Sequence, residues 1–119
     1  MSITREKLSG STDGNPIKIT QTAIGTGDTI HTAVASTTSW DEVWMWVTNT
    51  HSSDVTLTVG WDGSTDPDNL ICKTVTIPAL TGPVLVIPGI IINNSGVVTA
   101  AAGTANELVV TGFVNRIVP

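Results

Sequence analysis

The chain has 119 residues, of which 40% are hydrophobic and 13% charged, and its formal net charge is −5. This length predicts one domain with a single core, and such sparse charge predicts that part of the surface is not turned toward water. The five basic residues form no cluster on an acidic chain, so we expect no nucleic-acid partner.

No segment indicates a membrane or a secretory route. The first residues, MSITREKLSGSTDGNP, contain no apolar run typical of a signal peptide. No later run approaches the roughly 20 apolar residues that a membrane helix needs. We therefore expect a soluble protein made in the cytoplasm, with no membrane partner. Cys72 is the one cysteine, which excludes an intrachain disulfide.

In chain order, the first element is a polar segment rich in Ser, Gly and Asp over residues 1–16, which predicts a flexible N-terminal arm. Residues 17–119 then show strand-like segments separated by turn residues. We expect strands at Ile17–Thr22, Thr29–Ala33, Trp40–Asn49, Val55–Trp61, Ile71–Ile77, Val84–Ile92, Val97–Ala102 and Glu107–Val114. The enrichment in Val, Ile and Thr favours strands. Their regular spacing predicts an all-β fold, an antiparallel β-sandwich of jelly-roll type.

The segment Trp40–Asn49 is apolar on both faces. Alternation along a strand separates its tryptophans (Trp40, Trp44, Trp46) from its aliphatic side chains (Val43, Met45, Val47). We expect a hairpin with Val55–Trp61, in which two registers are open, and a shift of one residue exchanges the faces. We favour the register that buries the aliphatic face, because Trp is enriched at the centres of interfaces. The three tryptophans are then an oligomer interface.

Two further strands repeat this excess of apolar surface. Both Val84–Ile92 and Glu107–Val114 carry large apolar side chains on each face. One explanation is that loops cover central strands. We prefer contact with another subunit, because interfaces favour aromatic residues and are depleted of Lys and Glu.

Residues suited to catalysis are few. The chain has two histidines, His31 and His51, and no tyrosine. His51 lies beside Ser52, Ser53 and Asp54 in one short loop, where adjacent residues cannot converge on a substrate atom as a catalytic triad does. No catalytic or nucleotide-binding motif occurs. We therefore expect no enzymatic activity and no cofactor.

The loop WDGSTDPDNL is the one segment rich in possible metal ligands. Asp62, Asp66 and Asp68 are weak candidates for calcium, which prefers six to eight oxygen ligands. Their spacing is not that of an EF-hand, and Asp-Gly and Asp-Pro are common turn sequences. We expect a turn without metal.

The tryptophans also allow a second functional class. Trp44 and Trp46 lie two residues apart on one face and could stack on pyranose rings. The polar partners on that face are Glu42 and Thr48, fewer than a sugar site usually has. A carbohydrate-binding module is therefore the alternative to a protein interface.

Four segments together suggest a family. They are the start MSITREKLSGSTDGNPIKI, the middle TIHTAV and DEVWMWVTNTHSSDVTLTVGW, then VLVIPGIIINN, and the ending TGFVNRI. Over nearly its whole length the chain resembles small virion proteins of tailed bacteriophages, in particular head decoration, or cement, proteins. The resemblance implies a β-rich homotrimer, synthesised in the host cytoplasm, that binds the major capsid protein on the outer surface of the virion.

The resemblance also implies a role for the predicted arm. A terminal arm of such a protein lies along the shell, and we assign the capsid contact to Ile3, Arg5, Lys7 and Leu8. Ordering a free arm costs about 1–2 kcal/mol per residue, so we expect it to be fixed only on the capsid. No catalytic residue is implied. A receptor-binding tail or fibre module and a tail-tube or head–tail joining protein are the other virion roles left open.

Overall fold

Nine strands and one short 3₁₀ turn make up the computed structural model, which describes residues 1–119. The strands are β1 (Ser2–Lys7), β2 (Ile17–Lys18), β3 (Asp28–Thr32), β4 (Trp40–Asn49), β5 (Val55–Trp61), β6 (Leu70–Ile77), β7 (Thr81–Ile92), β8 (Val97–Ala102) and β9 (Leu108–Val118), and the turn η1 spans Ile24–Thr26. The expectation of an all-β chain is confirmed. No helix in the chain has the length and apolar character needed to cross a membrane.

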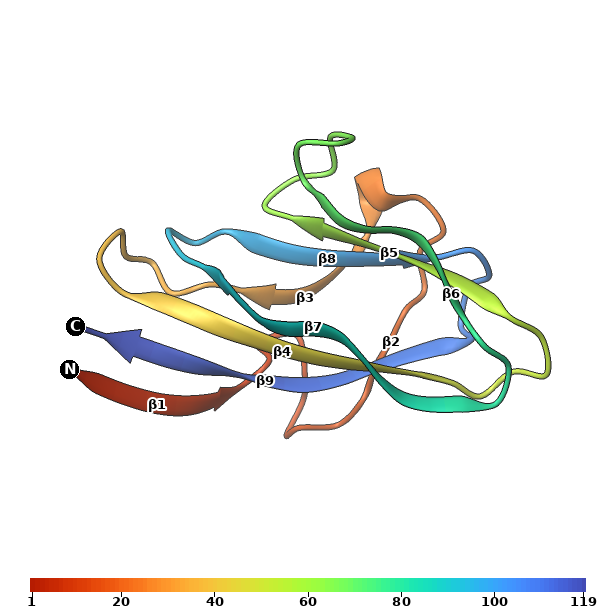
Figure 1. The fold of residues 1–119 in the computed structure, drawn as a ribbon, viewed down its shortest axis with the longest axis horizontal. Coiled ribbons are helices and arrows are strands. Elements are labelled where there is room, and N and C mark those ends of the chain that lie inside the picture. The colour runs from red at the N-terminus through yellow and green to blue at the C-terminus, as the bar shows by residue number, and fades with distance from the viewer.

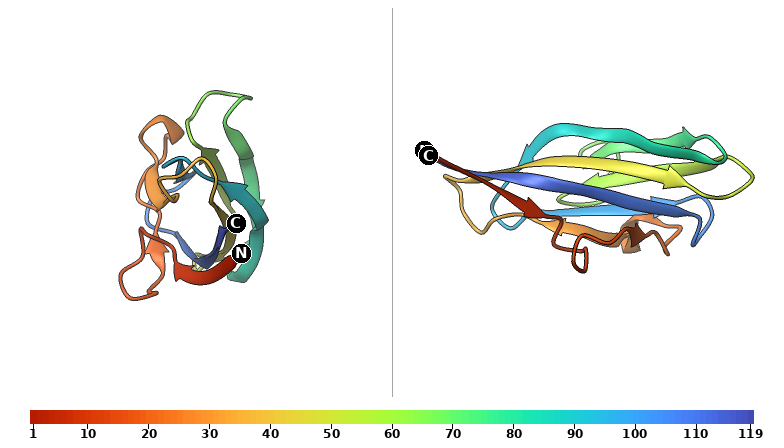
Figure 2. Two further views of the ribbon diagram at one scale, coloured as in Figure 1. Left: turned by 90° about the vertical axis from the view of Figure 1, so that its left-hand side faces the viewer. Right: turned by 90° about the horizontal axis from the view of Figure 1, so that it is seen from below.

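The strands form two antiparallel sheets that pack face to face (Figures 1 and 2). Sheet A has the order β1-β9-β4-β7, with β2 also paired to β9, and sheet B has the order β3-β8-β5-β6. Four of the pairs are nested along the chain: β2 with β9, β3 with β8, β4 with β7, and β5 with β6. Successive pairs alternate between the sheets, so the expected β-sandwich is confirmed.

The core between the sheets contains the aliphatic face of β4. Val43, Met45 and Val47 are fully buried, whereas the tryptophans of the same strand are half-buried on the other face. Across the core they meet β5, whose Leu57 and Val59 are also fully buried. The favoured orientation of Trp40–Asn49 is therefore confirmed, and Trp61 packs against the core only in part.

The predicted hairpin of Trp40–Asn49 with Val55–Trp61 is wrong. The two strands belong to different sheets, and β4 pairs with β7 and β9 instead. The buried faces of both strands instead belong to one core, from opposite sheets. In the connecting loop the buried Asn49 donates from Nδ2 to the carbonyl oxygens of Ser53 and Ile77, each at 3.0 Å, and accepts the His51 N–H at 2.9 Å. These bonds hold the loop through which the chain passes from one sheet to the other.

The N-terminal segment also differs from the expected flexible arm. Ser2–Lys7 is the edge strand β1, which pairs with β9 from Ser2 opposite Val118 to Lys7 opposite Phe113. Leu8 follows and is fully buried. The backbone then runs so close to β3 that a Cβ on Gly10 would lie 2.5 Å from the carbonyl oxygen of Thr29. The strand could not be predicted from the sequence because an edge strand of polar composition has little apolar periodicity. Both termini lie together at one end of the molecule (Figure 2).

Candidate functional site

The outer face of sheet A carries three aromatic side chains in mutual contact, which we name the aromatic cluster: Trp44, Trp46 and Phe113. Trp44 lies directly opposite Phe113 in the pairing of β4 with β9. The centroid of the Trp44 ring lies 6.4 Å from that of Trp46 and 6.4 Å from that of Phe113. The ring centroids of Trp46 and Phe113 are 5.9 Å apart. All three side chains are only half-buried, so the cluster presents apolar surface to the outside.

The indole of Trp44 is held by a hydrogen bond to Glu42 and by the backbone of Gly89. Its Nε1–H donates to Glu42 Oε1 at 2.7 Å, and the same oxygen accepts a hydrogen bond from Asn115 Nδ2 at 3.1 Å. Both bonds stabilise the carboxylate and lower the pKa of Glu42 below its usual value, and the bond from Trp44 has the larger effect. Gly89 backs the ring at a φ of +79°, and a Cβ there would lie 2.8 Å from an indole carbon. The Trp44 surface is therefore preorganised for contact.

Further apolar side chains extend the face away from the aromatic cluster. Trp40 is half-buried beside Ile117 of β9. On β7, Leu85 is 44% exposed and Ile91 is 58% exposed. The register places Leu85 opposite Trp46 and Ile91 opposite Glu42, which puts both on the outer face. The three tryptophans predicted to form an interface thus lie on one apolar face of the sheet.

Of the residues assigned to a capsid-contacting arm, three lie on the edge strand β1 and the fourth lies in the core. Ile3, Arg5 and Lys7 lie on β1, and Ile3 is 60% exposed. The Arg5 guanidinium carbon lies 4.4 Å from the centroid of the Phe113 ring, a cation–π contact. Lys7 Nζ donates to the Ser11 carbonyl at 3.0 Å. Leu8 belongs to the core, so it is not available to a partner and its assignment was wrong.

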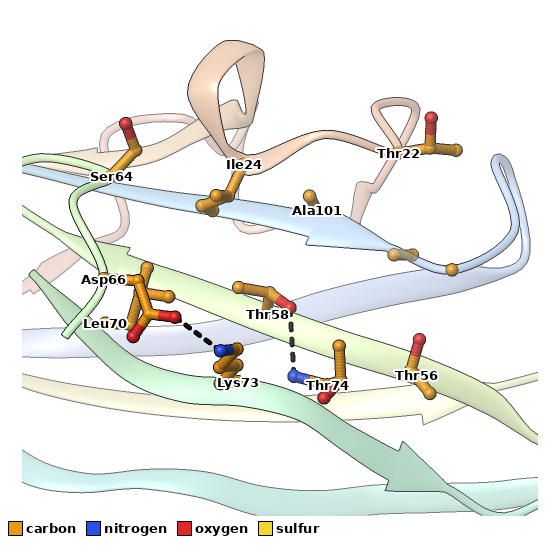
Figure 3. A pocket seen from close by; sticks show the side chains of 12 residues that line it. Thr22, Ile24, Thr56, Thr58, Ser64, Asp66, Leu70, Lys73, Thr74 and Ala101 are labelled. Carbon is orange, nitrogen blue, oxygen red and sulfur yellow. Dashed lines mark hydrogen bonds and ion pairs between the residues drawn. The ribbon is translucent and has the colours of Figure 1, made fainter.

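The outer face of sheet B has a different character. It contains an open hollow of about 330 Å³ between the 64–74 segment and η1 (Figure 3), lined by Thr22, Ile24, Thr56, Thr58, Ser64, Asp66, Leu70, Lys73, Thr74, Ala101, Ala102 and Gly103. Thr58 Oγ1 accepts the Thr74 N–H at 3.1 Å, and Lys73 forms an ion pair with Asp66. These contacts engage Thr58, Lys73 and Asp66 within the protein, and the lining contains no histidine, cysteine or aromatic ring.

The aspartate loop between β5 and β6 is held by protein contacts. Asn69 Nδ2 donates to the carbonyl oxygens of Trp61 at 3.1 Å and of Asp62 at 3.3 Å. Of the three candidate ligands, Asp66 faces Lys73, and Asp62 occupies a turn conformation with a φ of 55°. Asp68 is exposed. No group of three or more His, Cys, Asp or Glu side chains in the chain could hold a metal ion.

A buried ionic cluster, not anticipated from the sequence, joins the N-terminal segment to both sheets. Arg116 of β9 donates from Nε to Asp41 Oδ1 at 2.8 Å and from Nη2 to Oδ2 at 3.0 Å. His31 Nε2 lies 2.7 Å from Asp41 Oδ2, and His31 Nδ1 accepts the backbone N–H of Ser9 at 3.0 Å. Because Nδ1 is an acceptor, Nε2 carries the proton and donates it to Asp41.

The arrangement of Ser9, His31 and Asp41 superficially matches a catalytic triad but cannot work as one. The Ser9 hydroxyl accepts the Thr32 N–H at 2.7 Å, and it is the backbone of Ser9 that bonds to the ring. Both nitrogens of His31 are occupied, and the side chain is 1% exposed. A general base needs a free nitrogen within reach of a substrate proton. This cluster is structural.

The charge state of Asp41 follows from its surroundings. Burial alone raises the pKa of this carboxyl, but the hydrogen bonds from Arg116 and His31, with the positive charge of Arg116, outweigh it and hold the pKa below its ordinary value. A signal for this cluster was present in the sequence. Asp41 falls in phase with Val43 and Met45 on the buried face of β4, and a charge in that position needs a buried partner.

The remaining reactive groups offer no site. His51 Nδ1 lies 2.6 Å from Glu107 Oε2, away from the seryl and aspartyl neighbours in its own loop, and Asp54 Oδ1 accepts the Ala79 N–H. Burial against the core raises the pKa of the Cys72 thiol, which keeps the thiol protonated and unreactive at neutral pH.

Comparisons with protein-family models, curated proteins and solved structures found no match to this chain. The inference of function therefore starts from the surfaces of the chain itself.

Proposed function

We propose that this protein is a structural component of a tailed-bacteriophage virion that decorates and stabilises the capsid by binding its outer surface. The observation that carries a structural role, built on protein–protein contacts, is the fixed aromatic cluster on a rigid sheet. Side chains that are already immobile lose little conformational entropy on association, and exposed apolar surface of this kind is typical of protein interfaces. The resemblance to decoration proteins provides the partner, the major capsid protein.

The nested strand pairs support the jelly-roll form of the sandwich. A jelly roll is a double-sheet fold of eight strands built from two Greek keys. The four pairs from β2·β9 to β5·β6 alternate between the two sheets, as one long hairpin does when it is wrapped around a core. Such a closed body gives the outer faces a rigid support.

Self-association through the tryptophan face is the second part of the proposal. Trp40, Trp44 and Trp46 are outward on sheet A, whereas the hollow on sheet B is lined largely by hydroxyl-bearing and small side chains. One face is thus suited to a protein contact and the other to water. The sequence resemblance favours a trimer.

The edge of sheet A supplies the capsid contact. The far side of β1 pairs with no other strand, and unpaired edges can add a strand from a partner. On this strand Ile3 offers exposed apolar surface, and Arg5 and Lys7 offer positive charge on an acidic protein. These three residues keep the role assigned to them from the sequence.

A carbohydrate platform is the second candidate, favoured by the neighbouring rings of Trp44 and Trp46. Sugar sites combine stacking with hydrogen bonds to hydroxyl groups. Here the Trp44 N–H and Glu42 Oε1 already bond to each other, and Asn115 bonds to the same oxygen. The polar groups nearest to the rings are thus engaged within the protein, which favours the protein interface.

The decisive experiment is cosedimentation with virus particles. Particles of the encoding phage that lack this protein are mixed with purified wild type, with Ile3→Asp on β1, or with Thr58→Asp in the hollow on sheet B. Wild type and Thr58→Asp should pellet with DNA-filled heads, and Ile3→Asp should bind at least tenfold more weakly. Wild-type protein that stays in the supernatant, or that binds isolated tails and not heads, contradicts the decoration role. Quenching of tryptophan fluorescence by host glycan would instead support the carbohydrate platform.

A further inference from the structure

The ring of His31 links the N-terminal segment to both sheets of the core. His31 lies on β3 of sheet B, and its side chain is 1% exposed. Its Nδ1 accepts the backbone N–H of Ser9 at 3.0 Å, and its Nε2 donates to Asp41 Oδ2 of sheet A at 2.7 Å. The neutral ring has one lone pair and one proton for such bonds. The lone pair holds the N-terminal segment, and the proton holds Asp41.

The residues around this contact fasten the N-terminal segment over β3. Leu8 is fully buried in the core. Ser9 Oγ accepts a backbone N–H of β3 at 2.7 Å, and the Gly10 N–H donates to a carbonyl oxygen of β3 at 2.9 Å. We name residues 8–10 the latch. The preceding strand β1 is held by its ladder with β9, and most of its side chains are exposed. The latch therefore anchors β1 to the body of the protein.

A proton on Nδ1 is incompatible with the closed latch. In the charged ring both nitrogens are donors, so Nδ1–H would point at the Ser9 N–H across the same 3.0 Å. Two opposed donors repel each other, and neither has a partner in a buried site. The Nε2–H bond to Asp41 is unaffected, and the carboxylate provides an opposite charge for the ring. The cost of protonation therefore falls on the bond to Ser9.

The other charged groups near the ring keep their charge in weak acid. Burial raises the pKa of Asp41, but the hydrogen bonds from Arg116 and His31 hold that pKa below its ordinary value. Asp41 and, to a smaller extent, Glu6 raise the pKa of Arg116. Asp28 of β3 bonds to the segment 20–21, and the adjacent β8 has no ionisable residue. Histidine is the side chain that ordinarily changes charge between pH 5 and pH 8, so the ring is the group that titrates here.

We propose that His31 is a pH-sensitive switch, whose protonation at Nδ1 breaks the bond to Ser9 and shifts residues 2–10 toward a released state. In that state the charged ring donates from Nδ1 to water and from Nε2 to Asp41. Because Leu8 must leave the core, the closed state remains the majority and acid raises the population of the minor one. The released segment is the free arm that its polar composition predicts. The switch is independent of the partner that β1 binds.

The size of the shift follows from the proton that is taken up on release. When one state binds one proton more than the other, their ratio changes tenfold for each pH unit over which that proton binds. An exposed histidine titrates near pH 6.5. Between about pH 7.5 and about pH 5 the released population should therefore rise at least tenfold, with an upper limit of about thirtyfold.

Amide hydrogen exchange measured by mass spectrometry tests the switch, at about pH 7.5 and about pH 5 and with the intrinsic exchange rates corrected for pH. In wild type, the amides of residues 3–10 should open at least tenfold more often at the lower pH, while β4 and β5 keep their protection. His31→Gln should lose this pH dependence, because its amide offers an acceptor and a donor but takes up no proton. His51→Gln is the matched control and should respond to pH as wild type does, since His51 pairs with Glu107 away from the latch.

Three results overturn the switch: equal opening of residues 3–10 at both pH values, an acid response that persists in His31→Gln, or loss of protection in β4 and β5 together with the segment. Circular dichroism shows whether His31→Gln is folded. A second measurement needs no variant. In ¹⁵N spectra of wild type, protonation of the His31 ring and opening of the segment should share one midpoint. A ring that is still neutral when the segment opens, or charged while the segment stays closed, also overturns the switch.

Discussion

Asp41→Asn should be among the most damaging single substitutions in this protein. Asp41 is fully buried and accepts hydrogen bonds from Arg116, His31 and the Val34 N–H. An asparagine side chain has the same shape, but it has no charge and presents an NH₂ donor where the carboxylate accepted bonds. Both carboxylate oxygens accept hydrogen bonds from Arg116 or His31. Whichever way the asparagine amide is turned, its NH₂ group therefore faces at least one of these donors.

The size of the effect follows from the burial of the two partners. Removing one member of a buried ion pair costs about 3–5 kcal/mol, because the other charge is left uncompensated. The Arg116 side chain is 31% exposed and can turn part of its charge toward water, so we expect a loss of about 3 kcal/mol, near the lower limit. Domains of this kind are stable by about 5–15 kcal/mol. The melting temperature should fall by roughly 10–20 °C.

The dependence of stability on pH identifies the cause. Because the pKa of Asp41 is lower in the folded state than in the unfolded state, its ionisation stabilises the fold above the unfolded pKa, about 3.9. That contribution is lost as the pH falls through the folded pKa. As the pH falls below about 4, wild type should therefore lose stability that Asp41→Asn does not lose. The difference in free energy of unfolding between the two proteins should then narrow.

The assay is urea unfolding followed by tryptophan fluorescence, at one fixed protein concentration and at several pH values. Asp66→Asn is the matched control, because the same chemical change there affects an exposed ion pair with Lys73, where about 1 kcal/mol or less is expected. If Asp41→Asn and Asp66→Asn lower the free energy of unfolding at pH 7 equally, or if the Asp41→Asn gap is the same at pH 7 and pH 3, the reasoning is refuted.

Two further predictions concern the faces of β4 and the N-terminal segment. Met45→Ala should lower the free energy of unfolding by about 2–5 kcal/mol, as expected for a cavity in the core, whereas Trp44→Ala should mainly weaken subunit association, by about 2–4 kcal/mol. Thermal unfolding and sedimentation of the two variants check this pair, and the opposite pattern would mean that the tryptophans are the core. Leu8→Ala should also cost about 2–5 kcal/mol in chemical unfolding, while a neutral result would mean that this segment is a free arm.

The strands could be predicted from the sequence because their signals are local. Punctuation by turn residues and enrichment in β-branched side chains located β4, β5 and β8 with the bounds that the structure has. The alternation of side chains in β4 separated its two faces, and the preference of Trp for interfaces selected the correct one to bury. These properties depend on residues a few positions apart in one strand.

The partner of each strand could not be predicted in the same way. The sequence favoured a hairpin of β4 with β5, because neighbours in the chain commonly pair. The loop that leads β5 into the other sheet is held by hydrogen bonds of Asn49 to Ser53 and Ile77. The Ile77 acceptor is 28 residues away in the sequence. Likewise, β1 has no apolar pattern, and it is ordered by its ladder with β9 at the far end of the chain.

The aromatic cluster shows the same division within one surface. The sequence alone determined that Trp44 and Trp46 share a face, since side chains two residues apart on a strand point the same way. Only the tertiary structure brought Phe113 and Arg5 to that face, and backed Trp44 with Gly89. Contacts between strands distant in sequence form when the apolar surfaces of both sheets are buried together. Their geometry is therefore a property of the closed sandwich, which no single strand carries.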